Sequence, residues 1–536
     1  MRKHWLYLAI IFAFSLFMLR SLLSQGMMYA HDSIWHVERL SHMFSSLSSQ
    51  FPLRWSHSLD HGYGAPLFNF IYPGPYYLGS ILMFVGLGPL AVFNLLMFGG
   101  YLLGGLGIYF LSKKPLHGLI ASLIYLTIPY QFLDIFVRGA LGEVIALGII
   151  PWILLVYTRQ ESSKKLLWYS PFPLAILIIS HNFYGYLFCG ILLLLMAFVY
   201  KSKKNLLMSF LLSLGLSAFF ILPAFVERPL LLSSQSEPVS YRDHFVYPSQ
   251  LLDPTWRYLG SQLGFDKYEM SYQLGISTIA ILILSIYFAF RAKLKVSRAY
   301  LAYLGITLAS IFMLLPTSDF LWSSIPLLSS LQFPWRFLGV IAVMTPLLYL
   351  ELASLLKGKL FYVSVLIVLT ISIILSFSYT KPLKTLTSAE FLTLHYQNVG
   401  GTTTAHREEI VPKWSKDERY LAETGSWVRG SGEVTVSNLQ DSSGDLSFDA
   451  ESGEGQTAIV ARNYYPSWRA TVDDQWVAIS PSDEGDIIIP LVPGNHHYTL
   501  SVVNTRVQLL GNYFTLASLL FCLFVFYQNI KAGHSK

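Results

Sequence analysis

Long apolar runs recur along almost the whole chain, and they limit the possible folds more than any other feature of the sequence. A helix needs about 20 mostly apolar residues to cross a lipid bilayer. Hydrophobic residues make up 53% of the 536 residues and charged residues only 13%, a balance far from that of soluble globular proteins. The sequence therefore predicts a polytopic α-helical membrane protein of about twelve spans, at 4–24, 90–112, 116–133, 143–158, 171–181, 183–200, 206–226, 272–290, 299–317, 334–355, 360–379 and 508–528.

The basic residues indicate how these spans are oriented. Lysine and arginine collect on the cytoplasmic side of membrane segments. Outside residues 381–506, 18 of the 27 basic residues fall on every second connection. This alternation predicts a multi-pass protein of the cell (plasma) membrane with both termini in the cytoplasm. The segment 171–181 is too short to cross alone, so we expect it to form a broken or re-entrant pair with its neighbour.

Residues 381–506 differ from the rest of the chain. They carry 10 basic and 17 acidic residues, a net charge of −7, whereas the remaining residues are at +13. Their short β-branched and aromatic segments, bounded by Gly, Pro, Asp and Ser, are typical of strands. We expect an extracytoplasmic antiparallel β-sandwich, with a hairpin turn at Asp473-Asp474 and strands at 433–437, 457–461, 468–472, 476–479, 486–491 and 497–503.

The sequence thus predicts three parts. Residues 1–380 form a membrane domain with a long first outer loop at 25–89, residues 381–506 form the β domain, and residues 507–536 form the last span and a cytoplasmic tail. Four tryptophans of the β domain are expected either in its core or exposed as platforms for a sugar: Trp414, Trp427, Trp468 and Trp476.

Charged groups near the apolar phase are expensive, so they mark function by default. Directly after the first span stand His31, Asp32 and His36. In a helix, Asp32 and His36 are one turn apart on the same face. The carboxylate could take a proton from an acceptor hydroxyl while the imidazole orients it. Alternatively, Asp32 simply caps the first turn of a helix.

Further candidates lie on the other outer connections. Arg138 and Glu143 are squeezed between two spans, and they either pair with each other or present the arginine to a phosphate, whose oxygens match the guanidinium fork. Arg336 at the outer end of a span raises the same question. His31, Arg54 and His181 also lie on outer connections and are candidates for substrate contacts.

The first outer loop also contains residue types that bind divalent metal ions. His57, Asp60 and His61 could contribute to a divalent site, although the surrounding Gly and Pro residues favour a loop whose side chains contact substrate or the membrane interface. The two cysteines, Cys189 and Cys522, both lie in apolar runs. A thiolate zinc site and a disulfide framework are therefore not expected.

Several motifs resemble known membrane proteins. An acidic residue after the first span, a long outer loop, many further spans and a distal β domain look like the GT-C superfamily of membrane glycosyltransferases. More narrowly, the chain resembles the YfhO-like and "6-pyruvoyl-tetrahydropterin synthase-related" bacterial membrane proteins. This likeness rests on Arg-Gly-Ala-Leu-Gly-Glu (138–143), Ser-His-Asn (180–182), Gln-Phe-Pro-Trp-Arg-Phe (332–337) and Tyr-Tyr-Pro-Ser-Trp-Arg-Ala (464–470).

The resemblance implies an inverting transferase that moves a sugar from a polyprenyl-phosphate donor to a glycan, lipid or protein acceptor at the outer face. By position Asp32 would be the general base, with Arg138 and Arg336 on the lipid phosphate. The chain lacks the Asp-x-Asp motif of the metal-using members, and no three-histidine set on strands supports the zinc of a pterin synthase. Membrane lipids are expected partners, and nucleic acid is not.

Two other functions are compatible with the sequence. The first is a lipid or glycan flippase or transporter, although such proteins place charges near the bilayer midplane, whereas here the charges crowd the outer ends. The second is a non-catalytic envelope scaffold whose β domain binds polymer. The position of Asp32 separates a transferase from a silent protein. An Asp32 that lines an outer cavity together with Arg138 supports transfer, whereas an Asp32 that caps a buried helix end supports a silent protein.

Overall fold

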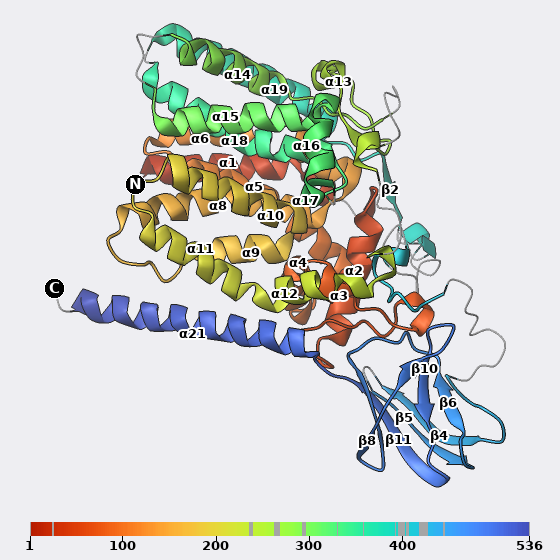
Figure 1. Cartoon of the computed structure of the whole chain (residues 1–536). Coiled ribbons are helices and arrows are strands. Elements are labelled where there is room, and N and C mark those ends of the chain that lie inside the picture. Colours follow the sequence, from red (N-terminus) through yellow and green to blue (C-terminus); the bar gives the residue numbers. More distant parts are fainter. Residues whose placement is uncertain are drawn as a thin grey trace.

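The chain forms a bundle of long helices with a β region attached at one end (Figure 1). Helix α1 begins and helix α21 ends at the same end of the bundle, and α2, α3 and the strands gather at the opposite end. This computed structural model describes residues 2–23, 26–234, 240–261, 269–291, 296–329, 331–356, 358–387, 389–391, 393–394, 403, 407–416, 427–442 and 445–534.

Apolar helices occupy each of the twelve segments expected to span the membrane, and shorter helices connect them. Within the described residues the helices are α1 (Arg2–Met18), α2 (Ser33–Ser46), α3 (Leu67–Phe70), α4 (Gly74–Phe84), α5 (Pro89–Leu111), α6 (Pro115–Leu126), α7 (Pro129–Phe132), α8 (Leu141–Ser162), α9 (Phe172–Ser180), α10 (Asn182–Phe198), α11 (Lys204–Leu216), α12 (Ala218–Val226), α13 (Pro248–Leu252), α14 (Ile276–Ala289), α15 (Arg298–Leu314), α16 (Asp319–Ser324), α17 (Pro326–Ser329), α18 (Phe337–Leu355), α19 (Lys359–Ser376) and α21 (Arg506–His534).

Not all of these helices are long enough to cross a membrane by themselves. In the described part of the chain, five have the required length and composition, and up to eight spans result if each of three bent helix pairs counts as one. The protein is therefore a helical multi-span membrane protein. The bends have local causes: α6 ends at Leu126 and α7 restarts after a 52° bend at Pro129, because proline has no N–H to continue the helical ladder.

The β region consists of two antiparallel sheets, of order β3-β6-β10-β9 and β4-β5-β11-β7-β8. Side chains from both sheets form one hydrophobic cluster, with Val460 and Ile487 from the first and Phe448 and Tyr498 from the second. A separate small sheet pairs β1 with β2. The strands are β1 (Met27–Tyr29), β2 (Lys384–Leu386), β3 (Val428–Gly430), β4 (Thr435–Ser442), β5 (Asp445–Ser452), β6 (Thr457–Val460), β7 (Trp468–Val472), β8 (Gln475–Val477), β9 (Ser480–Pro481), β10 (Ile487–Pro490) and β11 (Gly494–Val502).

Each of the six expected strand segments contains a strand. Asp473 and Asp474 form the expected turn between β7 and β8, both with positive φ (43° and 66°). The tryptophans divide between the two expected roles: Trp468 lies in the core, whereas Trp476 on the edge strand β8 is 69% exposed. Strand β5 was not expected, because its outward positions are Asp, Ser and Glu.

The first outer loop is joined to the β region. Trp55 lies inside the hydrophobic cluster of the sheets, with its ring centroid 5.5 Å from that of Trp468. Asp60 accepts hydrogen bonds from Arg407 at 2.6 and 2.8 Å and from Asn463 at 2.8 Å. The core of the β region therefore includes a side chain from 25–89, a segment far away in the sequence.

Candidate functional site

The motif at 138–143 forms a sharp turn that touches the start of α2. A π-helical turn, Leu133–Arg138, ends at Gly139, which has φ 65°. The backbone oxygen of Arg138 accepts the Asp32 N–H at 2.8 Å. A Cβ at Gly139 would lie 3.0 Å from the Cβ atoms of Ala30 and Ser33, so a larger residue would have to push them away, and the positive φ also favours glycine. The motif thereby fixes Asp32 beside Arg138.

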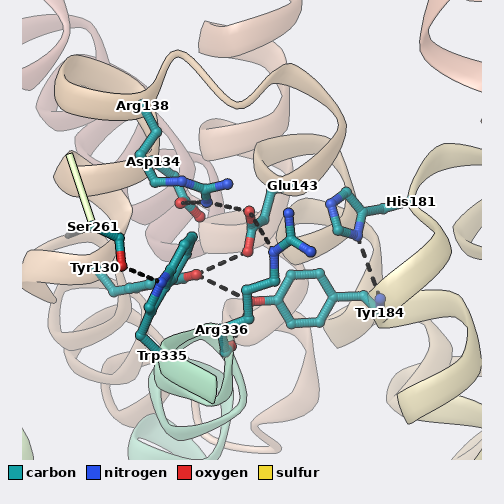
Figure 2. Close-up of polar contacts among 9 residues, drawn as sticks. All are labelled: Tyr130, Asp134, Arg138, Glu143, His181, Tyr184, Ser261, Trp335 and Arg336. Atoms are coloured by element: carbon teal, nitrogen blue, oxygen red, sulfur yellow. Dashed lines mark hydrogen bonds and ion pairs between the residues drawn. The ribbon is translucent and has the colours of Figure 1, made fainter. Parts of the chain in front are cut away.

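Arg138 is buried between two carboxylates (Figure 2). Its Nη1 donates to Asp134 Oδ1 at 2.6 Å and also contacts Glu143 Oε2. Tyr130 donates to the other oxygen of Glu143 at 2.8 Å, and the Trp335 ring lies 4.4 Å from the guanidinium carbon. Of the two roles expected for Arg138, the structure contains the ion pair, and it adds Asp134 as a second anion. Such a buried arginine without its partners would be strongly destabilising.

Arg336 reaches the same cluster from the start of α18 but is held less tightly. Its Nε lies 3.9 Å from Glu143 Oε2, and its side chain is 19% exposed. Within the described part of the chain this guanidinium makes no hydrogen bond, and its Nε is buried without a partner. The Phe333 ring lies 4.9 Å from its guanidinium carbon. Arg336 is therefore the arginine of the cluster that retains donors for an anion.

Asp32 occupies the N-cap position of α2, yet its side chain makes no capping hydrogen bond. It is half-buried, and no described residue hydrogen-bonds to its carboxylate. Since the expected capping role is not filled, the carboxylate is available for other chemistry.

His36, one turn along α2, faces the interior. Its Nδ1 lies 2.8 Å from the Tyr76 hydroxyl, and Arg39 Nη1 lies 3.4 Å from that hydroxyl. Burial, followed in effect by Arg39, lowers the pKa of His36 well below its usual range, so the ring is neutral near pH 7. His36 therefore holds the Tyr76 hydroxyl in place.

The other expected residues lie at different places. His181 caps α10 by accepting the Tyr184 N–H at 3.4 Å, and its ring lies 5.2 Å from that of Tyr72. His31 is exposed, with Nε2 3.0 Å from the Tyr258 carbonyl oxygen. His181 therefore borders the cluster, whereas the His31 side chain lies on the surface.

Arg54 does not join the Arg138 cluster. It is buried and donates to the Phe219 carbonyl at 2.9 Å and to Asn512 at 2.8 Å. It also donates to Asn69 at 3.2 Å and to Asn504 at 3.3 Å. All three guanidinium nitrogens are thus bound to protein groups, which fits a structural role.

Several members of the site were not expected from the sequence. Tyr184 donates to the Arg336 carbonyl at 2.8 Å, and Trp335 donates to Ser261 at 3.1 Å (Figure 2). Tyr130 and Asp134 were missed as well. Tyr184 follows the quoted Ser-His-Asn motif by two residues, and Trp335 stands inside Gln-Phe-Pro-Trp-Arg-Phe, so neighbouring motifs were the available signal.

The described residues do not gather metal ligands at this site. Among the described ranges, no group of three or more His, Cys, Asp or Glu side chains could hold one. His57 instead packs against the Trp468 ring, with centroids 6.1 Å apart.

Comparison with known proteins identifies relatives at the level of family and fold. Residues 68–382 match the model of the family described as "6-pyruvoyl-tetrahydropterin synthase related domain; membrane protein". No curated protein sequence matches the chain.

Two solved transferases resemble this chain in structure, both with low TM-scores. Arabinofuranosyltransferase AftD from Mycobacteria is 14% identical, with a TM-score of 0.43 over 70% of this chain and 26% of that one. Oligosaccharyltransferase AglB from Archaeoglobus fulgidus, solved with an inhibitory peptide and a dolichol-phosphate, is 17% identical, with a TM-score of 0.43 over 72% of this chain and 56% of that one. The chain thus spans about a quarter and about half of the lengths of these proteins.

Proposed function

The chain belongs to this family of membrane proteins, and from that premise and the geometry of the site we propose that it is an inverting glycosyltransferase. It moves a sugar from a polyprenyl-phosphate donor to a glycan, lipid or protein acceptor at the outer face of the membrane. The observation that carries the proposal is the uncapped Asp32 carboxylate, tied through its backbone to Arg138. A carboxylate and a cluster that contains two arginines therefore lie together at one end of the bundle.

The reaction requires one displacement. The Asp32 carboxylate takes the proton of the acceptor hydroxyl, whose oxygen attacks the anomeric carbon as the bond from that carbon to the phosphate oxygen breaks. The electron pair of that bond leaves with the phosphate. One carboxylate is enough, because a direct displacement inverts the anomeric centre and needs no protein nucleophile.

The two arginines have different tasks. Arg138 is already shared by two carboxylates, so it holds the cluster together and orients Glu143. Arg336 has free donors and partial exposure, and its fork suits two oxygens of the departing phosphate. Charge stabilisation of the leaving group by a preorganised cation is a large part of catalysis in such reactions.

The proposal includes a topology. All twelve apolar segments cross or enter the membrane, both termini are cytoplasmic, and 381–506 is extracytoplasmic. The common end of α1 and α21, opposite the site and the β region, supports placing both termini on one side of the membrane and the β region on the other (Figure 1). The isoprenoid tail of the donor then stays in the lipid while its phosphate meets the outer ends of the helices.

A direct experiment tests this function. Purified protein in lipid nanodiscs is incubated with a panel of polyprenyl-phosphate sugars, and release of polyprenyl phosphate is measured with and without hydroxylated acceptors. We expect release with at least one donor and inversion of its anomeric configuration. Absence of release with every donor, in protein that also fails to bind polyprenyl phosphate, would contradict the proposal.

A further inference from the structure

Tyr72 lies close enough to the proposed base, Asp32, and to the proposed phosphate ligand, Arg336, for both charges to affect the pKa of its hydroxyl, and it has no task in the displacement. Its ring is nearly parallel to that of Tyr76, at 6.2 Å and 11°, and meets the His181 ring at 5.2 Å. It therefore connects the α2 side of the site, where Asp32 lies, with the side of the Glu143 cluster. Tyr72 itself is half-buried, whereas Tyr76 is fully buried.

The motif at 138–143 provides a seat for this ring. A Cβ at Gly142 would lie 2.6 Å from the Tyr72 hydroxyl oxygen and 2.5 Å from Cζ, distances that real side chains do not adopt. Any residue other than glycine would push the phenol away. Gly142 is thus explained by the position of the Tyr72 hydroxyl.

The Tyr72 hydroxyl is a neutral group under opposing charges. Burial raises its pKa well above the usual range; Tyr76 and Asp32 add to that rise, while Arg39 and Arg336 oppose it. Near pH 7 the phenol therefore keeps its proton and can donate a hydrogen bond. Among the described residues this hydroxyl hydrogen-bonds to the Tyr76 hydroxyl, and no backbone group or charged side chain hydrogen-bonds to it.

We propose that Tyr72 contacts the transferred sugar, with its hydroxyl donating a hydrogen bond to a sugar oxygen and its position setting which sugar the site accepts. This inference rests on the proposed function, because a group near both the base and the phosphate ligand is also near the part of the donor that lies between them, which is the sugar. A site that hydrogen-bonds a substrate hydroxyl also rejects analogues that lack it.

Two variants test the inference. Tyr72→Phe keeps the stacked ring and removes only the hydroxyl, whereas Gly142→Ala keeps the hydroxyl and displaces the ring. Tyr77→Phe is the matched control, because the Tyr77 hydroxyl accepts the Leu53 N–H at 2.9 Å and serves the loop rather than the site. Affinities are measured by thermophoresis for bare polyprenyl phosphate and for the panel of polyprenyl-phosphate sugars.

In the unchanged protein, we expect at least one sugar-bearing lipid to bind more tightly than bare polyprenyl phosphate. Tyr72→Phe should reduce this extra affinity by about 3- to 10-fold, the effect of one neutral hydrogen bond, while leaving the affinity for the bare lipid unchanged. Gly142→Ala should also reduce the extra affinity and leave the affinity for the bare lipid unchanged. In the Tyr72→Phe background it should reduce the extra affinity little further. Tyr77→Phe should leave both affinities unchanged.

The outcomes separate this inference from the proposed function. Tyr72 does not contact the sugar if the sugar adds the same affinity in Tyr72→Phe as in the unchanged protein, or if it adds none in either. Binding of the bare lipid would in that case still support the proposed function. If Gly142→Ala reduces the affinity that the sugar adds by the same factor in the Tyr72→Phe background as it does alone, Gly142 does not act through this ring. If the unchanged protein binds neither lipid, the proposed function and this inference both fail.

Discussion

At the scale of single residues, Asp32 combines a helix-start position with an unused side chain. Its backbone N–H is bound to Arg138, so its location does not depend on the carboxylate. Asp32→Asn should therefore leave the thermal melting temperature nearly unchanged while lowering the transfer rate by about 10²- to 10⁴-fold, the usual effect of losing a general base. Nanodisc assays of release, together with a thermal melt, check both parts.

Asp60→Asn is the contrasting variant for this test. Asp60 is a buried carboxylate of the same loop, but Arg407 and Asn463 hold it. Removing that buried charge should lower the melting temperature, because the Arg407 guanidinium loses the carboxylate that it pairs with. Full transfer activity in Asp32→Asn would exclude Asp32 as the base.

Arg336 and Arg138 should respond differently to lysine. In Arg336→Lys the charge stays but the fork is lost, so we expect an affinity for polyprenyl phosphate about 10-fold weaker, at the lower end of charge-assisted hydrogen bonds. Its melting temperature should barely change. Arg138→Lys should lower the melting temperature, because one ammonium cannot match the contacts of Arg138 with Asp134 and Glu143. Unchanged lipid affinity in Arg336→Lys would remove this residue from the phosphate site.

At the scale of elements, the turn at 138–143 holds two parts of the site through its glycines. Gly139→Ala should cost about 1–2 kcal/mol, because φ 65° is strained for an L side chain. The new methyl group would also push away Ala30 and Ser33, and with them Asp32. We expect a lower melting temperature and slower transfer, measured in the same assays.

Gly86→Ala is the control for strain alone. Gly86 also has a positive φ, 93°, but a Cβ there meets no atom within 4 Å. It should reduce stability without slowing transfer. Equal activities of the two alanine variants would mean that the contact between the turn and α2 does not position Asp32.

The elements themselves could largely be predicted from the sequence, whereas their contacts could not. Apolar runs mark helices because a helix pairs all of its own backbone groups, as a lipid environment requires. Pro129 marks a break because proline has no N–H to continue the helical hydrogen bonds. Strand β5 was not predicted from the sequence. Its buried residues Leu446, Phe448 and Ala450 alternate with strongly polar residues, and this alternation was the only feature that indicated a strand.

The charges of the site could be singled out as costly in an apolar setting, but their grouping depends on tertiary contacts. Glu143 and Arg336 are almost 200 residues apart in the sequence and meet only in the fold. Tyr72 and Tyr130 look like the many other aromatic residues of the chain. Arg54 was a reasonable candidate for a phosphate, and nothing local in the sequence indicates the two asparagines and the carbonyl group that surround it most closely.

At the scale of the whole molecule, the β region is connected to the helices by buried polar and aromatic contacts. Glu227, which follows α12, accepts hydrogen bonds from Asn69 and Tyr465 at 2.8 Å and from Gln508 at 3.0 Å. These donors come from the first outer loop, the β region and α21. Together with Trp55 in the core of the sheets, they make the first loop a common support for the site and for the β region.

His57 should make this junction sensitive to pH. Burial, with Arg462 adding and Asp441 opposing, lowers the pKa of His57 to about 4, against about 6.5 in an unfolded chain. Between these values the unfolded chain binds a proton that the folded chain does not, so stability is complete above about pH 6.5 and falls as the pH decreases toward 4. The loss is at most about 3 kcal/mol.

The expected result is a melting temperature in nanodiscs that decreases from pH 7.5 to pH 5, together with faster protease cleavage between the β region and the bundle. His57→Phe keeps an aromatic ring against Trp468 but cannot titrate, so part of this decrease should disappear in the variant. Comparing the two proteins cancels the titration of other groups, since these are common to both. Identical slopes of melting temperature against pH in the two proteins would show that protonation of His57 does not affect stability. The contact between the first loop and the β region would then not depend on the charge of His57.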